Sequence, residues 1–195
     1  NLGGESLRLD EAQSVWQASH SLDFIRQYMI KNVHLPLHNS LLHLWMRFFG
    51  SSETAVRLLA AIPGIAALPA LWLLAREFVS KRWALFAVLI GSISPFAVWY
   101  SRENRMYSLL FLLAILSHYF FIKILRESET ARGAGERRYY ILYALVGVIG
   151  IYTHYFFILA LLAQAVFFGA LWLAAVLQDE PGEGKFALRA RSIFI

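Results

Sequence analysis

The sequence YYILYALVGVIGIYTHYFFILALLAQAVFFGALWLAAVL, residues 139–177, decides the class of fold. These 39 residues include no Asp, Glu, Lys or Arg. A helix of about 20 apolar residues crosses the hydrocarbon of a bilayer, so this stretch is long enough to cross twice. A tight turn near residues 154–157 is expected to join the two crossings. The sequence therefore predicts a membrane protein.

Three more stretches have the same character, residues 58–75, 83–100 and 108–125, and Lys123 is the one charged residue in them. Hydrophobic residues make up 58% of the 195-residue chain, more than a soluble core of that size encloses. We predict an all-α polytopic membrane protein with about five transmembrane helices, at residues 54–78, 83–100, 107–126, 138–155 and 157–177. Kinks are expected at the prolines inside these spans, Pro63, Pro69 and Pro95.

The positively charged residues indicate the orientation of the spans. Loops at residues 1–53 and 102–107 are predicted to face outward, into a periplasm or an extracellular space, because most Lys and Arg lie in the other loops. The net charge of +5 is therefore explained by basic residues in the loops on one side of the membrane, and it indicates no nucleic-acid partner. We predict a multi-pass protein of the inner, or plasma, membrane. Eleven of the 18 Lys and Arg mark the cytoplasmic side: Arg76, Lys81, Arg82, Lys123, Arg126, Arg132, Arg137, Arg138, Lys185, Arg189 and Arg191.

Residues 1–53 are expected to form an outward loop of amphipathic helices at the membrane surface. One helix is predicted over residues 21–31, starting from a serine cap, and another over residues 36–50, ending at a glycine. Such helices suit a sequence that is too polar to cross a bilayer and too apolar to stay in water. The transmembrane domain follows at residues 54–177.

The two ends of the chain indicate that it belongs to a longer protein. Asn1 is not an initiator Met and no signal peptide is present, so an upstream crossing or a removed signal is expected. Residues 178–195 are predicted to be a cytoplasmic loop that leads to a truncated further span. The sequence has no cysteine, so no disulfide stabilises the outward loop.

The acidic pair Asp10-Glu11 is the first candidate for chemistry. A carboxylate just outside a bilayer can accept the proton of an acceptor hydroxyl and turn that hydroxyl into a nucleophile. The pair also fits an ordinary exposed helix start, where acidic residues interact favourably with the helix dipole. The residues alone leave both interpretations open.

The second candidate is the short loop between two spans that holds Arg102, Glu103 and Arg105. A guanidinium presents a rigid fork of donors that fits phosphate oxygens, and at a membrane surface the phosphate is that of a lipid headgroup. In the alternative interpretation, the arginines extend to the membrane surface and pair with Glu103. Tyr107, which follows, is typical of the aromatic belt at the interface.

Histidines are also concentrated in the outward part of the chain, at His34, His38, His43 and His154. Imidazoles bind metals or phosphates, but their spacing matches no established metal motif, so no metal ligand is assigned. No cofactor is predicted, and the sequence leaves open whether a divalent metal ion assists. His154 is of interest because the expected topology places it on the same side as Asp10 and the arginines.

In their order and spacing these residues resemble a known family, the membrane glycosyltransferases of the GT-C class. The likeness is to bacterial relatives of protein O-mannosyltransferases and of the lipid A aminoarabinose transferase, and it covers nearly the whole chain. Where the family often shows His-Pro-Pro-Leu, this chain has His34-Leu35-Pro36-Leu37. The segments that carry the resemblance are Asp10-Glu11, Pro36-Leu37, Ser52-Glu53 with Arg57, Pro95, Tyr100-Ser101-Arg102-Glu103-Asn104-Arg105-Met106-Tyr107-Ser108 and Tyr152-Thr153-His154-Tyr155-Phe156.

The resemblance implies an enzyme that moves a sugar from a polyprenyl-phosphate donor to a hydroxyl of a protein, lipid or glycan acceptor in the cell envelope. The displacement inverts the anomeric carbon, with Asp10 as the catalytic base and Glu11 beside it. Negative charge grows on the leaving phosphate, and cationic groups there lower the barrier. The residues placed at that phosphate are Arg102, Arg105, Arg57 and His154. The residues expected to support the site are Glu103, Tyr107, His34 and His38.

Two other functions fit some of the same features. A transporter or lipid flippase also carries prolines and polar residues within its spans. It predicts charges at mid-bilayer, however, whereas most charges here lie at the outer edge. A non-catalytic membrane scaffold leaves the cluster of Arg102 and Arg105 unexplained. Members of the resembled family have more spans than this chain, so the chain is expected to be only part of an enzyme.

Overall fold

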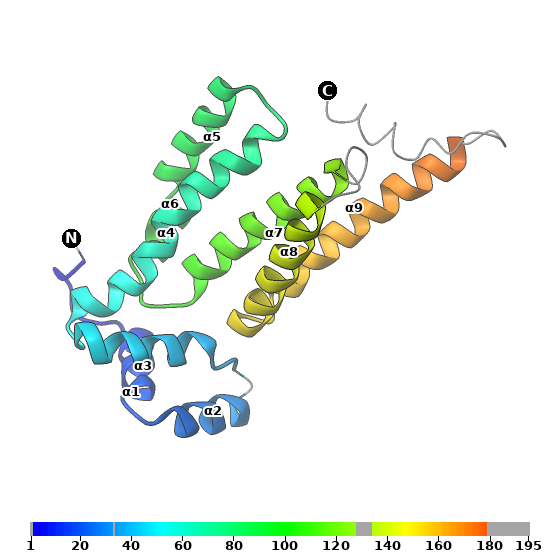
Figure 1. Ribbon diagram of the computed structural model, residues 1–195. Coiled ribbons are helices and arrows are strands. Elements are labelled where there is room, and N and C mark those ends of the chain that lie inside the picture. The colour runs from blue at the N-terminus through cyan, green and yellow to red at the C-terminus, as the bar shows by residue number, and fades with distance from the viewer. Residues whose placement is uncertain (1, 33, 128–133, 179–195) are drawn as a thin grey trace.

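The computed structural model describes residues 2–32, 34–127 and 134–178, and within these ranges every regular element is a helix. One group of helices forms a bundle that includes the longest helices, and three short helices pack across one end of it (Figure 1). The short helices are α1 (Leu9–Ala18), α2 (Leu22–Lys31) and α3 (Leu37–Phe49). The bundle consists of α4 (Glu53–Arg76), α5 (Lys81–Ile93), α6 (Pro95–Ser101), α7 (Tyr107–Glu127), α8 (Ala134–Thr153) and α9 (Phe157–Gln178). The all-α fold predicted from the sequence is confirmed.

Within the described ranges, α4, α7 and α9 are long and apolar enough to cross a membrane, and the bent pair α5 and α6 adds a fourth span if it is counted as one. The pair bends by 59° at the break before Pro95, which confirms the kink expected there. In contrast, α4 continues through Pro63 and Pro69 as one helix.

The fourth predicted span, residues 138–155, corresponds to α8, which lies against α7. Near its start α8 carries three charged residues, Glu136, Arg137 and Arg138. These charges shorten its apolar stretch, so α8 is not among the helices that are long and apolar enough to cross a membrane. A fifth crossing therefore stays a prediction. The loop and further span predicted after α9 lie outside the described residues, since the description ends at Gln178.

Local capping explains where α2, α3 and α4 begin or end. The Ser21 hydroxyl accepts a hydrogen bond from the Phe24 N–H at 3.3 Å and caps α2. Ser52 caps α4 in the same way through the N–H of Ala55 at 3.3 Å. Gly50, after α3, has a φ of 78°, a conformation that glycine adopts without strain. The two amphipathic helices predicted before the first span are confirmed.

The polar side of α3 packs on α1, a helix that the sequence pattern does not predict separately. Asn39 donates from its side-chain amide to Gln17 Oε1 at 2.5 Å, and His43 Nδ1 lies 2.8 Å from the Ala18 carbonyl oxygen. On the other side of α3, Leu44 and Phe48 are exposed. An exposed apolar side and a buried polar side are what a helix at a membrane surface requires.

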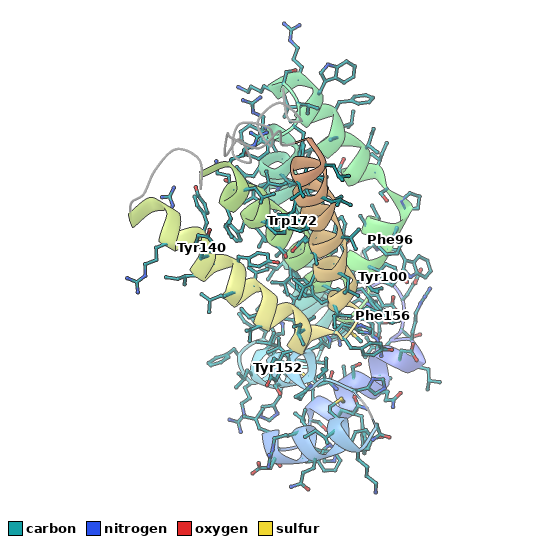
Figure 2. All side chains as sticks on the ribbon, turned by 90° about the vertical axis from the view of Figure 1, so that its right-hand side faces the viewer. Phe96, Tyr100, Tyr140, Tyr152, Phe156 and Trp172 are labelled. Atoms are coloured by element: carbon teal, nitrogen blue, oxygen red, sulfur yellow. The ribbon has the colours of Figure 1, made fainter. Side chains whose placement is uncertain are left out.

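Inside the bundle, α7 is the central helix and contacts α4, α8 and α9. Ala67 and Ala70 of α4 pack against Ile115 of α7, and small residues of this kind let membrane helices approach closely. Large apolar side chains such as Val166 remain exposed, as expected where lipid surrounds the bundle. Figure 2 places Tyr152 and Phe156 near the α1–α3 end and Trp172 nearer the opposite end.

A buried polar cluster joins the three helices α7, α8 and α9. Gln164 of α9 is 2% exposed; its amide nitrogen donates to the Ser117 hydroxyl at 2.9 Å, and its amide oxygen accepts from the Tyr143 hydroxyl at 2.6 Å. Such interhelical hydrogen bonds hold neighbouring membrane helices in register, because lipid offers no alternative partners.

Replacing Gln164 by Leu should therefore lower the stability of this helix trio. We expect a loss of about 0.6–1.7 kcal/mol, because Ser117 and Tyr143 lose their shared partner. The measurement is thermal unfolding in detergent, with Val166→Leu, an exposed position on the same helix, as the control. Equal melting temperatures for wild type and Gln164→Leu would contradict a role for this cluster.

Candidate active site at the α1–α3 end of the bundle

The acidic pair lies in the first turn of α1, and its two side chains border different pockets. Asp10 is exposed and lines a pocket of about 260 Å³, here called the Asp10 pocket. Glu11 is 1% exposed and lies at the buried end of a second pocket of about 220 Å³, here called the Trp99 pocket. Consecutive helical residues point in different directions, which explains the separation.

Glu11 forms a buried ion pair with Arg57 of α4. Arg57 Nε donates to Glu11 Oε1 at 3.0 Å and Arg57 Nη2 donates to Oε2 at 2.8 Å, the paired geometry in which guanidinium and carboxylate bind most strongly. Two backbone N–H groups complete the carboxylate's partners, those of Asn104 at 2.9 Å and Arg8 at 3.0 Å. Glu11 thereby joins α1, α4 and the loop between α6 and α7.

Every donor of the Arg57 guanidinium is in use. Besides its bonds to Glu11, Nη1 donates to the carbonyl oxygens of Leu2 and Glu5, both at 2.8 Å, and Nη2 donates to that of Ser6 at 3.1 Å. A guanidinium has five N–H donors, and five acceptors are present. Arg57 therefore fixes the segment before α1, and a phosphate would have to displace one of these bonds to reach it.

The pKa of Glu11 follows from these partners. Burial alone would raise the pKa of the carboxyl group, but the hydrogen bonds from Arg57, Asn104 and Arg8 together with the charge of Arg57 outweigh burial and lower it to about 2. Glu11 is therefore ionised at neutral pH, and the low pKa makes it a weaker base than an ordinary carboxylate. The exposed carboxylate of the acidic pair is that of Asp10.

The Asp10 pocket brings together residues from four parts of the chain. His34 lies just before α3, His38 lies in α3, Arg105 lies in the loop between α6 and α7, and His154 lies in the turn between α8 and α9. Arg105 Nη1 is 3.5 Å from the Asp10 carbonyl oxygen, so the arginine reaches the start of α1. Carboxylate, guanidinium and imidazoles thus face one space.

His154 is neutral and its tautomer is defined by a backbone contact. Its Nδ1 accepts a hydrogen bond from the Phe156 N–H at 3.1 Å, so the proton is on Nε2. Burial lowers the pKa of His154, and the charges of His34 and Arg105 lower it further. The Tyr107 ring lies 6.1 Å from that of His154, measured between centroids, and 6.0 Å from the Arg105 guanidinium carbon.

His38 is the most buried histidine of the pocket, at 6% exposed. Burial lowers its pKa to about 4, assisted by the charge of Arg105 and partly offset by the Asn104 backbone, so the ring is neutral at physiological pH. Its Nε2 has no hydrogen-bond partner among the described residues, and neither has Arg105 Nε. Buried polar atoms without a partner are rare in proteins and are found where a ligand or water binds.

An apolar groove of about 270 Å³ adjoins the Asp10 pocket, and His38 and Arg105 line both spaces. The groove runs between α3, α4 and α7, with walls that include Trp45, Leu59 and Leu109. A polar pocket at one end of an apolar groove matches a ligand with a charged head and a hydrocarbon tail.

The structure thus divides the residues predicted for the site into two groups. One group lines the Asp10 pocket: Asp10, Arg105, His34, His38 and His154, with Tyr107 in ring contact with His154. The other group lines the Trp99 pocket: Glu11, Arg57, Arg102 and Glu103. Arg102 and Arg105, expected at one phosphate, therefore border different spaces.

Sequence reasoning missed two features of the site. One is the apolar groove, which depends on how three helices meet and leaves no local signal. The other is Asn104, which is 0% exposed and whose backbone N–H holds Glu11. Its side-chain oxygen and nitrogen have no partner among the described residues. Within those residues no group of three or more His, Cys, Asp and Glu is arranged to hold a metal ion.

These features define a class of protein, a polytopic helical membrane protein with a charged pocket and an apolar groove at one end of its bundle. The family model described as dolichyl-phosphate-mannose-protein mannosyltransferase matches residues 33–179, so the chain belongs to that family. It is a glycosyltransferase of the GT-C type. The match begins after α2, and α1 with Asp10 and Glu11 lies outside it. No curated protein and no solved structure matches the chain.

Proposed function

We propose that the chain contributes the donor site and the catalytic base of an inverting glycosyltransferase that uses a polyprenyl-phosphate sugar. The observation that carries the proposal is that Asp10, Arg105 and His38 line one polar pocket, and that Arg105 and His38 also line the apolar groove beside it. Membership of a family described by dolichyl-phosphate mannose supports this class of donor.

Asp10 is the proposed general base. The oxygen of the acceptor hydroxyl forms a bond to the anomeric carbon, and its proton passes to the Asp10 carboxylate. The bond between the anomeric carbon and the phosphate oxygen breaks, and its electron pair leaves with the polyprenyl phosphate. Attack from the side opposite the leaving phosphate inverts the carbon. Exposure of Asp10 at the pocket gives an acceptor access to it.

Arg105 and His154 are the proposed partners of the phosphate. Charge develops on the leaving phosphate, and a guanidinium placed beforehand at that position stabilises the transition state. His154 donates from Nε2, since its Nδ1 is occupied by the Phe156 N–H. His38 is neutral, its Nε2 has no partner in the described part of the chain, and it is placed to hydrogen-bond the same headgroup.

The groove between α3, α4 and α7 is the proposed path of the polyprenyl chain. Its walls are mainly Leu, Ile, Ala and Trp side chains, and isoprene units bury apolar surface against them. Because Arg105 and His38 lie at its polar end, a phosphate held there leaves the first isoprene units in the groove.

Glu11 and Arg57 take a positioning role in this proposal. Their ion pair fixes the first turn of α1 and, through the Asn104 N–H, the segment that carries Arg105. The reaction is proposed to occur on the outer face of the inner or plasma membrane, as the distribution of Lys and Arg indicates. The acceptor is a hydroxyl of a protein, lipid or glycan.

Arg105→Ala tests the donor site. We expect the affinity of the full-length protein for dolichyl-phosphate mannose to fall about tenfold to a hundredfold, because a hydrogen-bonded charge partner of the phosphate is lost. Binding is measured in nanodiscs with radiolabelled donor. Arg102→Ala is the matched control, since it removes the same side chain from the same loop but from the other pocket. A larger loss in Arg102→Ala than in Arg105→Ala would contradict the assignment.

A further inference from the structure

One wall of the Asp10 pocket is polar, buried and uncharged, and the reaction proposed above gives it no role. This neutral wall consists of Ser14 and Gln17 of α1, Asn39 of α3 and Thr153 of α8, each between 2% and 6% exposed. It forms where α1 and α3 lie against each other at the end of the bundle (Figure 1). The Ser14 and Thr153 hydroxyls donate to backbone carbonyls of their own helices at 3.0 and 2.8 Å, so both oxygens remain acceptors.

The two amides of the neutral wall hold each other in a defined orientation. Asn39 Nδ2 donates to Gln17 Oε1 at 2.5 Å and also contacts the Met29 sulfur at 3.9 Å. A thioether sulfur accepts hydrogen bonds and cannot donate them, so the Asn39 atom beside it is the nitrogen. The atoms left for a ligand are therefore Gln17 Nε2 and Asn39 Oδ1.

These two atoms have unused hydrogen-bonding capacity. Within the described part of the chain, neither Gln17 Nε2 nor Asn39 Oδ1 forms a hydrogen bond. In contrast to His38 Nε2, neither is enclosed by protein, so both are accessible from the pocket that their side chains line. The pair presents two N–H donors and one acceptor, all without charge. A sugar hydroxyl, which donates one hydrogen bond and accepts others, fits such a pair.

The neutral wall lies where the sugar of the donor is expected. Asn39 directly follows His38, which is placed at the headgroup, and Gln17 follows Asp10 by two turns on the same side of α1. Seven helical residues rise by about 10 Å, and side chains lean back toward the start of the helix, so one sugar ring fits between Asp10 and Gln17. The acceptor approaches from the side opposite the phosphate, where the Asp10 carboxylate is exposed.

We propose that Gln17 and Asn39 bind ring hydroxyls of the donor sugar and select a neutral sugar over amino sugars and uronic acids. Gln17 Nε2 donates to one hydroxyl oxygen, and Asn39 Oδ1 accepts from a second hydroxyl. An ammonium or carboxylate at this wall would be buried beside amides that offer no opposite charge. Of the described residues that line the pocket, Asp10 is the one acid, and it lies at the exposed side. This inference rests on the proposed donor site, of which it assigns the part beyond the phosphate.

The test compares the binding of dolichyl-phosphate mannose and dolichyl phosphate, which differ only in the sugar, to the full-length protein in nanodiscs. Gln17→Met removes both free N–H donors and keeps a weak acceptor for Asn39 in a flexible side chain of similar length. We expect the affinity for dolichyl-phosphate mannose to fall about threefold to tenfold and that for dolichyl phosphate to stay unchanged. Gln27→Met, the same change at an exposed position of α2, should alter neither affinity.

Arg105→Ala separates this inference from the proposed function, because the loss of a phosphate contact should weaken the binding of both ligands. If it does so while Gln17→Met binds dolichyl-phosphate mannose as the wild type does, the donor site stands and the role of Gln17 is refuted. An equal loss of both ligands in Gln17→Met would show a structural effect and would also refute that role. Unchanged binding of both ligands in Arg105→Ala would refute the donor site itself, and the inference with it.

Two further measurements complete the test. Gln17→Glu replaces Gln17→Met if the latter does not melt at the wild-type temperature, since it keeps a strong acceptor for Asn39. Its added charge repels the phosphate of both ligands, so the decisive quantity is the additional loss for dolichyl-phosphate mannose, and no additional loss would refute the proposal. Dolichyl phosphate carrying mannosamine should bind the wild type less tightly than the mannose donor; equal or tighter binding would refute the preference for a neutral sugar.

Discussion

Asp10→Asn is expected to reduce sugar transfer by about a hundredfold to ten-thousandfold, because the variant loses the group that accepts the proton of the acceptor hydroxyl. Asn has nearly the shape of Asp, so the pocket keeps its volume and the donor continues to bind. The change therefore appears in the rate of transfer and not in the affinity for dolichyl-phosphate mannose. Transfer is measured with radiolabelled donor and an envelope fraction as acceptor.

The control for this variant is Asp23→Asn. Asp23 is an exposed carboxylate of α2, in a surface pair with Arg26, and it does not line the Asp10 pocket. Its loss should leave transfer unchanged. Equal rates for wild type and Asp10→Asn would show that another group accepts the proton, and Asp10 would then no longer be the base.

Glu11→Ala is expected to destabilise the α1–α3 end of the protein by about 3–5 kcal/mol. The variant leaves the Arg57 guanidinium buried without its carboxylate, and an unpaired buried charge is far more costly than the loss of a surface contact. The backbone N–H groups of Asn104 and Arg8 lose their acceptor as well. Hydrogen exchange should increase in α1 and in residues 102–106, while α9 keeps its protection.

The double variant Glu11→Ala with Arg57→Leu separates this ion pair from simple packing. Because it removes both charges, part of the lost stability should return. Asp23→Ala, which removes an exposed carboxylate, should change exchange very little. Unchanged exchange in the first turn of α1 on loss of Glu11 would contradict its positioning role.

The same pair predicts a dependence of stability on pH. The pKa of Glu11 is about 2 in the folded protein, whereas a Glu side chain in the unfolded chain has the ordinary value of 4.5. The folded form therefore binds the proton less readily than the unfolded form. The stabilising contribution is complete above pH 4.5 and is lost as the pH falls towards 2. Glu11→Gln removes this part of the acid sensitivity, and a comparison of melting temperatures against pH reveals it.

Most of the fold is predictable from the sequence because its signals are local. Apolar runs of sufficient length predict the spans, and the serine caps and Gly50 predict the ends of α2, α3 and α4. The break before Pro95 follows from the missing N–H of proline. α8 is less clear, since the charged residues at its start reduce the apolar run that marks a span.

The site is only partly predictable, because its partners are distant in sequence. The sequence indicates an acidic pair but not which carboxylate is buried. A signal does exist: Ser14 and Ala18 are buried on the same face of α1 as Glu11, at spacings of three and seven residues that a helical pattern links. In contrast, the pairing of Glu11 with Arg57, 46 residues away, depends on how α1 meets α4.

The division of Arg102 and Arg105 between two pockets has a similar cause. The two arginines are three residues apart, and a continuous helix would place them on one face. Residues 102–106 lie between α6 and α7, outside either helix, where the backbone N–H of Asn104 turns toward Glu11. Sequence spacing alone gives no indication of that turn.

Photo-crosslinking with a dolichyl-phosphate mannose analogue tests the central claim most directly. The analogue carries a diazirine in its first isoprene units, and the labelled residues are identified by mass spectrometry. With the phosphate at Arg105 and the chain in the groove, label is expected on Leu59, Ile62 and Leu109. Label confined to Pro95, Val98 and Trp99 would place the donor in the Trp99 pocket and contradict the proposed active site.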